Sequence, residues 1–151
     1  MNRSVKILII VLAVLILLPI VVFTAPMVYN NVILMTVEHD LKSAVKDTEG
    51  VELVDADSIC GNLNGNGNKM QFLAAVIVRC DDESLVKECF RKSGRYDKEY
   101  FRLRGKEPEL RCLERGKLDL DVTAYDYDDN MYLIYISSQP SYAWSFDIRA
   151  H

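Results

Sequence analysis

The chain has 151 residues and a formal net charge of −4 at pH 7, from 18 Lys or Arg against 22 Asp or Glu. This mildly acidic balance argues against nucleic acid as a bulk partner. The length is enough for one domain with its own core beside a separate apolar segment, and too short for two domains. We therefore expect a single folded unit.

The strongest feature is an unbroken apolar run of 17 residues, Ile7–Phe23, which follows Arg3 and Lys6. About 20 apolar residues in a helix cross the hydrocarbon core of a bilayer. The run therefore predicts an N-terminal membrane anchor over residues 1–26, with the lipid bilayer as its partner. The next cation is Lys42, so the positive-inside rule places the N-terminus in the cytoplasm and the remaining chain outside the plasma membrane.

Two other interpretations of the apolar run stay open. A cleaved signal peptide has the same basic start and apolar centre, but cleavage requires small residues at positions −3 and −1. A cut after Ala25 would place Phe23 at −3 and Pro26 just beyond the cut, and both are unfavourable. The run is also compatible with a buried helix of a soluble protein. We expect a retained single-pass signal anchor.

The chain beyond the anchor predicts a juxtamembrane helix and then a domain. Between Leu34 and Val45, apolar residues recur at intervals of three and four, which indicates an amphipathic helix within residues 27–50 that Gly50 ends. No Ser/Gly-rich linker separates this helix from the anchor. Residues 51–151 are predicted to form one extracytoplasmic α+β domain close to the bilayer.

Hydrophobic periodicity predicts the elements of this domain. Val51–Cys60 and Met70–Val78 are typical of strands, and the nearly continuous apolar pattern of the second indicates burial on both faces. Asp81, Asp82 and Ser84 are candidate caps of a helix that ends near Gly94, and a further turn or two of helix is expected around Tyr100. Leu118–Tyr127 and Met131–Ser137 then form a second pair. The prediction is an antiparallel sheet of about four strands in two hairpins, with helices on one face.

The loop Gly61–Asn68 joins the first two strands and is the most unusual local feature. Asn-Gly pairs accept positive φ and favour a hairpin turn. The alternative is a binding loop whose backbone N–H groups hold an anion, and its candidate residues are Asn62, Asn64, Gly65, Asn66, Gly67 and Asn68. The loop fits neither glycine-rich nucleotide fingerprint and contains no carboxylate for calcium. We expect a plain hairpin loop.

The four cysteines form no C-x-x-C pair, so a zinc site is not expected. Buried free thiols and a single disulfide are equally compatible with the sequence. A hairpin centred at Asn64–Gly65 places Cys60 opposite about Lys69 and far from Cys80. A disulfide, if one forms, is therefore predicted to involve Cys89 or Cys112.

The remaining polar motifs predict no catalytic or metal site. Glu38-His39-Asp40 carries one of only two histidines, and adjacent residues on a helix diverge, so a histidine-based triad or zinc catalysis is not expected. Residues 126–130 are typical of a solvated turn. Residues 87–117 carry eleven Lys or Arg against six Asp or Glu, which suits either a solvated face or a patch for anionic lipid headgroups or wall polymer. We expect no cofactor.

Two resemblances bear on function. An apolar helix that leads into an amphipathic helix and an antiparallel sheet resembles type IV pilins and pseudopilins, but the Gly before Phe-Thr-Leu-Ile-Glu of that family is absent. The stretches Cys60–Asn68 and Phe146–His151 are similar to small single-pass membrane proteins of Gram-positive bacteria. That similarity implies a bacterial cell envelope and carries over neither an activity nor a site.

The sequence therefore favours a membrane-anchored extracytoplasmic domain with a binding or structural role and no enzymatic activity. Its partner would be a protein or an anionic envelope component. The alternatives are an anchored enzyme that uses carboxylates without histidine, and a subunit of a pilin-like assembly.

Overall fold

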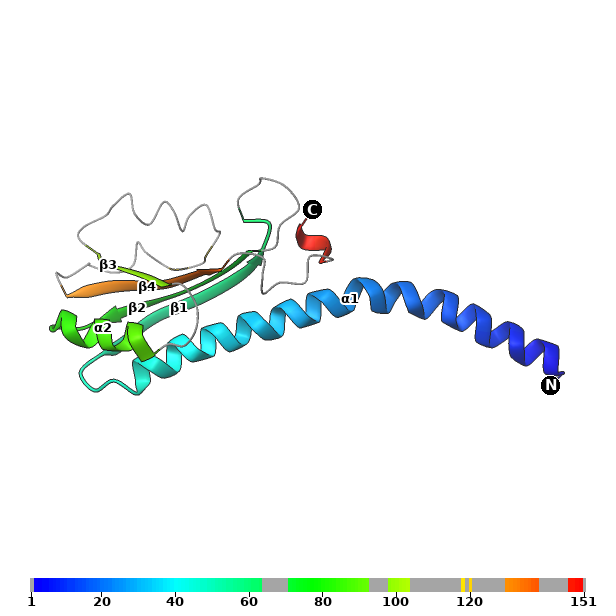
Figure 1. The fold of residues 1–151 in the computed structure, drawn as a ribbon, viewed down its shortest axis with the longest axis horizontal. Coiled ribbons are helices and arrows are strands. Elements are labelled where there is room, and N and C mark those ends of the chain that lie inside the picture. Colours follow the sequence, from blue (N-terminus) through cyan, green and yellow to red (C-terminus); the bar gives the residue numbers. More distant parts are fainter. Residues whose placement is uncertain are drawn as a thin grey trace.

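The computed structural model describes residues 2–63, 71–92, 98–103, 118, 120, 130–138 and 147–150. These residues form an α+β fold (Figure 1), as the sequence predicted. In chain order the elements are α1 (Arg3–Lys46), β1 (Glu52–Gly61), β2 (Gln71–Arg79), α2 (Glu83–Lys92), β3 (Lys98–Arg102), β4 (Met131–Ser138) and the short 3₁₀ helix η2 (Ile148–Ala150). The four strands make one antiparallel sheet in the order β1-β2-β4-β3.

Helix α1 is continuous over 44 residues, or about 66 Å at the usual helical rise. The sequence predicted an anchor and then a second helix that begins at Met27. The structure instead has one helix, with Pro19 and Pro26 inside it. A proline within a helix removes one backbone hydrogen bond and bends the axis without always ending the helix. Figure 1 shows α1 bending where it leaves the sheet.

The N-terminal half of α1 extends away from the sheet and packs against nothing in the described part of the chain (Figure 1). Every residue from Arg3 to Thr24 is exposed. By length and composition this helix can cross a membrane, and none of its most apolar 18-residue window is buried. The core helix of a soluble protein would be mostly buried. The exposure therefore argues against a core helix, and it suits a membrane anchor or a signal sequence equally.

The C-terminal half of α1 belongs to the core of the domain. Val37, Leu41 and Val45 recur every four residues and are buried against the sheet. Helix α2 adds Val86 and Cys89 to the same cluster. The two helices therefore cover one face of the sheet, as predicted.

Strand β2 lies between β1 and β4 and is buried on both faces. Ala74, Val76 and Val78 join the cluster under the helices, whereas Leu73, Ala75 and Ile77 join a second cluster on the opposite face with Met131 and Leu133 of β4. Alternate residues of a strand point to opposite faces. This double burial explains the nearly continuous apolar sequence and confirms the interpretation made from it.

The first hairpin is confirmed, but its predicted register is wrong. Cys60 lies opposite Phe72, and Gly61 lies opposite Gln71, whereas a turn centred at Asn64–Gly65 would place Cys60 opposite Lys69. Strand β1 shifts register between Leu53 and Asp55. Strand β1 ends at Gly61, three residues before the first Asn-Gly pair at Asn64–Gly65. Turn residues alone therefore did not define the register.

Strand β3 replaces the helical turns that were predicted around Tyr100. It pairs with β4 so that Tyr100 lies opposite Ile134, and Tyr100 packs against the core cluster under the helices. Aromatic side chains suit a half-buried strand surface, and pairing with β4 outweighed the local helical pattern. The predicted second hairpin is wrong, because β4 pairs with β2 along one edge and with β3 along the other, which leaves no free edge for residues 118–127. Of those residues only Leu118 and Leu120 are described.

Candidate functional site

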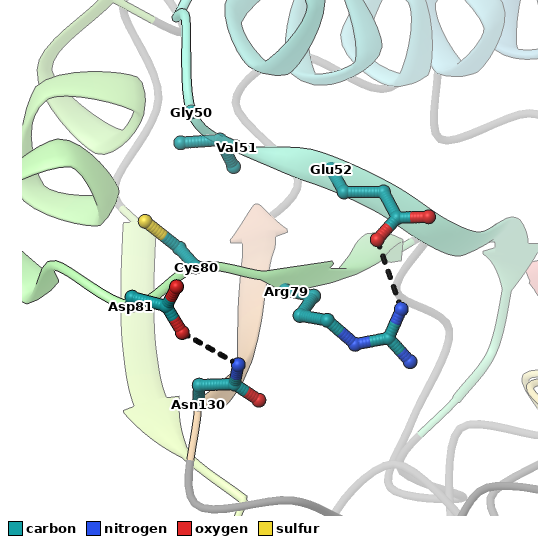
Figure 2. A pocket seen from close by; sticks show the side chains of 7 residues that line it. All are labelled: Gly50, Val51, Glu52, Arg79, Cys80, Asp81 and Asn130. Carbon is teal, nitrogen blue, oxygen red and sulfur yellow. Dashed lines mark hydrogen bonds and ion pairs between the residues drawn. The ribbon is translucent and has the colours of Figure 1, made fainter.

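A polar recess, here called the distal pocket, lies at the end of the sheet farthest from the exposed half of α1 (Figures 1 and 2). Its volume is about 360 Å³. It forms where the connection from α1 to β1, the end of β2 and the start of β4 converge. The lining residues are Gly50, Val51, Glu52, Arg79, Cys80, Asp81 and Asn130.

Two polar pairs line the distal pocket, and Figure 2 shows both. Arg79 Nη1 lies 2.9 Å from Glu52 Oε2, and Asn130 Nδ2 donates to Asp81 Oδ1 at 2.8 Å. The two carboxylates are therefore held by different partners. This arrangement suits binding of a polar group better than hydrolysis, which needs carboxylates that converge on one site.

The turn after β2 fixes one wall of the pocket. The Cys80 backbone N–H donates to the Asn130 carbonyl at 2.9 Å, which ties the end of β2 to the start of β4. Asp82 then accepts a hydrogen bond from the Ser84 backbone N–H at 2.8 Å. That bond lowers the pKa of Asp82 and caps α2. The predicted capping role of this segment is confirmed at Asp82.

Gly50 forms the opposite wall and has a φ of 84°. A Cβ atom at this position would lie 3.1 Å from Leu85 Cδ1 of α2. Helix α1 ends at Lys46, so Gly50 turns the chain from the helix end into β1. Both its backbone conformation and the contact with α2 favour glycine.

We expect Gly50→Ala to destabilise the domain by about 1 kcal/mol or more, because positive φ and the Leu85 contact both oppose a side chain. Thermal unfolding of the full chain in detergent, followed by circular dichroism, measures the loss. Glu49→Ala is the matched control at the exposed neighbouring position. Equal stability of the two variants would contradict this account of Gly50.

A second polar site, here called the C-terminal clamp, lies at the other end of the sheet. Its centre is Asp147, whose side chain is fully buried. Asp147 accepts hydrogen bonds from Asn30 Nδ2 at 3.0 Å, Arg149 Nε at 2.9 Å and the Arg149 backbone N–H at 3.0 Å. The hydrogen bond from the Arg149 guanidinium is the main cause that lowers the pKa of Asp147 to about 2, and Asn30 lowers it further.

The clamp holds three distant segments together. Arg149 Nη1 donates to Asn31 Oδ1 of α1 at 2.8 Å, and Arg149 Nη2 lies 3.3 Å from the Met27 carbonyl. The Arg149 carbonyl accepts the Asn62 backbone N–H at 3.1 Å. The Cys60 thiol donates to Asn31 Oδ1 at 3.6 Å. The clamp thus ties the end of β1 and residues 147–150 to the part of α1 next to the exposed half.

The clamp was not predicted as a site. The sequence analysis singled out the stretches around Cys60 and Asp147 only for a resemblance, and the structure brings them together. The hydrogen bond between Asp147 and Asn30 joins residues that are 117 positions apart. Such a tertiary contact cannot be predicted from the local spacing of residues. The available signal was the pair Asp147 and Arg149, two charged residues close together in a tail rich in aromatic and small residues.

The Asn-Gly loop lies mostly outside the described residues. Only Asn62 of its six candidate binding residues is described, and its backbone is engaged by the clamp. Asn64, Gly65, Asn66, Gly67 and Asn68 are not described, so their binding role stays a prediction.

The three described cysteines are free and buried. Burial is the main cause that raises the pKa of the Cys60 and Cys89 thiols. Cys60 lies at the clamp and Cys80 at the distal pocket, at opposite ends of β2, in line with the expectation that they do not pair. Cys112 lies outside the described residues, and a disulfide of Cys89 or Cys112 remains a prediction.

The other polar motifs are separated or already engaged where the structure describes them. His39 is 79% exposed, whereas Glu38 turns to Lys42 and to Ser58, whose hydroxyl donates to it at 2.5 Å. The hydrogen bond from Lys42 is the main cause that lowers the pKa of Glu38. The three residues of Glu38-His39-Asp40 therefore do not form a joint site. Among the described residues, no group of three or more His, Cys, Asp or Glu is placed to hold a metal ion.

Several cations of segment 87–117 have partners within the domain. Lys87 pairs with Glu83 and Lys92 with Glu88, each at 2.9 Å. Other contacts are those of Lys98 with the Phe90 carbonyl and ring, and of Arg102 with the Tyr132 hydroxyl and ring. These contacts favour the interpretation of a solvated mixed-charge face over a basic patch in the described part of this segment.

Comparisons of the chain with known protein families, with curated proteins and with solved structures found no match. Inferences about function therefore rest on the geometry of the chain itself.

Proposed function

We propose that the protein is a single-pass membrane-anchored domain, without enzymatic activity, that binds a polar ligand or envelope component outside the cell. Helix α1 carries the proposal. Its first half is apolar and fully exposed, and its second half is part of the domain core. One continuous helix thus joins a segment suited to lipid to a folded domain suited to water.

The same helix supports a fixed placement of the domain. From Pro26 to Lys46 the helix advances about 30 Å, and the distal pocket lies beyond Lys46. The clamp and the core hold the sheet against this length of α1. The distal pocket is therefore presented at the outer end of the domain, away from the bilayer.

The chemistry of the distal pocket supports a small polar ligand or a polar group of a larger one. Its volume of about 360 Å³ is at the lower end of the range of small-molecule sites. Glu52, Arg79, Asp81 and Asn130 offer both donors and acceptors there. Because the two carboxylates have separate partners, the pocket supports recognition more than acid–base catalysis.

Topology is the first test of this proposal. The test uses a Cys112→Ser background, because the described native cysteines are buried. One variant carries Glu49→Cys, at the end of the domain near the distal pocket, and the other carries Ser4→Cys, before the apolar run. In intact cells, an impermeant thiol reagent is expected to label Glu49→Cys and to label Ser4→Cys only after lysis. The reverse pattern would contradict the orientation.

Retention of the anchor is tested on the same samples. We expect the protein to stay in the membrane pellet after carbonate extraction and its mass to include the apolar run. A released protein that begins near Ala25 or Pro26 would show a cleaved signal peptide instead, and the proposal of an anchored domain would fall.

A further inference from the structure

Helix α1 carries a second apolar face beyond the predicted span, on the side away from the sheet. Val28, Val32 and Met35 are 61%, 57% and 68% exposed. Successive helix residues rotate by 100°, so these three positions point in one direction, nearly opposite to the buried Val37 and Leu41. The sheet therefore cannot cover them, and large apolar side chains in one stripe mark an interaction surface.

Lipid does not reach the whole of this face. A span that begins at Ile7 fills about 30 Å of hydrocarbon by Pro26, and headgroups add about 5–7 Å on each side. At 1.5 Å per residue, Val32 lies about 9 Å beyond Pro26 and Met35 about 13 Å beyond it. Met35 therefore projects past the headgroups of the bilayer. Lipid does not shield this apolar face from water there, and a protein partner can.

The three positions continue a regular pattern from within the span. Alternating steps of four and three residues give an apolar seam that consists of Ile7, Val11, Val14, Leu18, Val21, Ala25, Val28, Val32 and Met35. Within the span every face of the helix is apolar, so the span alone does not distinguish the seam from the other faces. Val28, Val32 and Met35 are the residues that identify it. A repeat of 3.5 residues is the pattern by which two helices pack in a left-handed coiled coil.

We propose that the apolar seam binds the seam of a second copy of this chain, in a parallel homodimer. The proposal rests on the membrane anchoring proposed above. Two copies anchored in one bilayer have the same direction and height, so each seam position meets its own counterpart. No Asp, Glu, Lys, Arg or His lies between Lys6 and Glu38, so no like charges oppose each other along the seam at neutral pH.

The buried area agrees with a dimer only if the whole seam takes part. An exposed aliphatic side chain of this size can bury roughly 60–120 Å² of surface. Val28, Val32 and Met35 of two copies then supply roughly 400–700 Å², less than the roughly 1,200 Å² of a specific interface. With the five large seam residues of the span, the total rises to roughly 1,000–1,900 Å². The anchor and the outer helix therefore act together.

Cysteine cross-linking of the full chain in native membranes tests the dimer. In the Cys112→Ser background, Val32→Cys and Met35→Cys are compared with Tyr29→Cys and Asp40→Cys, which lie about a quarter turn or more from the seam on the same helix. After brief oxidation with copper phenanthroline, we expect at least a fivefold higher yield of disulfide-linked dimer at positions 32 and 35 than at 29 and 40.

The outcomes separate this inference from the proposed function. Equal yields at all four positions, or no product at 32 and 35 in protein that stays in the carbonate-resistant pellet, would overturn the dimer and leave the anchoring intact. A product heavier than two copies would assign the seam to a different protein and also overturn it. Loss of the protein from the pellet would overturn both proposals.

A charged substitution gives an independent measurement. Val32→Lys in a chain that also carries Met35→Cys is expected to reduce the cross-linked dimer at least fivefold, because two lysines would meet in the seam. The membrane fraction and the protection of the buried Cys60 thiol should not change, since Val32 does not contact the domain core. An undiminished yield of dimer would refute the seam.

Discussion

Asp147→Asn is expected to open the end of the domain that the C-terminal clamp holds against α1. The substitution keeps the size of the side chain but removes the charge that the Arg149 guanidinium and the Asn30 amide both recognise. The pKa of Asp147 falls from an ordinary 3.8 to about 2 in the folded chain. By linkage this difference is worth on the order of 2 kcal/mol of stability at neutral pH.

The buried Cys60 thiol reports on this opening, because it shares Asn31 with the clamp. We expect N-ethylmaleimide to label Cys60 about 30-fold faster in Asp147→Asn than in the parent, since 1.4 kcal/mol corresponds to a factor of ten. Cys89 at the other end of the sheet should change less. Asp40→Asn, an exposed carboxylate on α1, is the control. Unchanged labelling of Cys60 would refute the clamp.

The sign of the pH dependence follows from the lowered pKa. The folded chain binds a proton at Asp147 less readily than the unfolded chain, so the charged carboxylate stabilises the fold. This contribution is complete above pH 4 and is lost as the pH falls towards 2. The stability difference between the parent and Asp147→Asn should therefore shrink below pH 4. A difference that grows on acidification would contradict the assignment.

Sequence periodicity predicted the parts of the fold that depend on long apolar patterns. The exposed apolar half of α1, the sheet-facing stripe of its second half and the doubly buried β2 each follow from a regular pattern. The predictions failed where tertiary pairing decided the outcome. Tyr100 joined a strand because β4 was beside it. At the loop end of the first hairpin, Cys60 already lies opposite Phe72 instead of Lys69, a register that the turn residues did not indicate.

The two candidate sites were less predictable than the fold. The distal pocket combines Gly50, Arg79 and Asn130 from three segments, and only the sheet order β1-β2-β4 brings them together. The clamp joins Asn30 to Asp147 across 117 residues. The sequence instead drew attention to a local feature, the Asn-Gly loop. Local composition identifies unusual turns, but sites built from distant strand ends require the topology.

Leu41→Ala is expected to cause the largest loss of stability among these variants, about 3 kcal/mol. Leu41 is 1% exposed and lies in the cluster that joins α1, α2 and the sheet. Removing a buried leucine loses its transfer free energy and leaves a cavity, and losses of 2–5 kcal/mol are typical. Alanine is a good helix former, so the substitution leaves α1 itself intact.

The result distinguishes two roles of the outer half of α1. If this half is part of the domain core, Leu41→Ala should accelerate labelling of both Cys60 and Cys89 about 100-fold, because their exposure then follows global unfolding. Thr36→Ala, an exposed position on the same helix, should change labelling less than threefold. A helix that merely tethers an independent sheet would give the same labelling rates in both variants. Leu41 thus tests whether the anchor and the domain are joined by one rigid element, on which the fixed placement of the distal pocket and the parallel seam both depend.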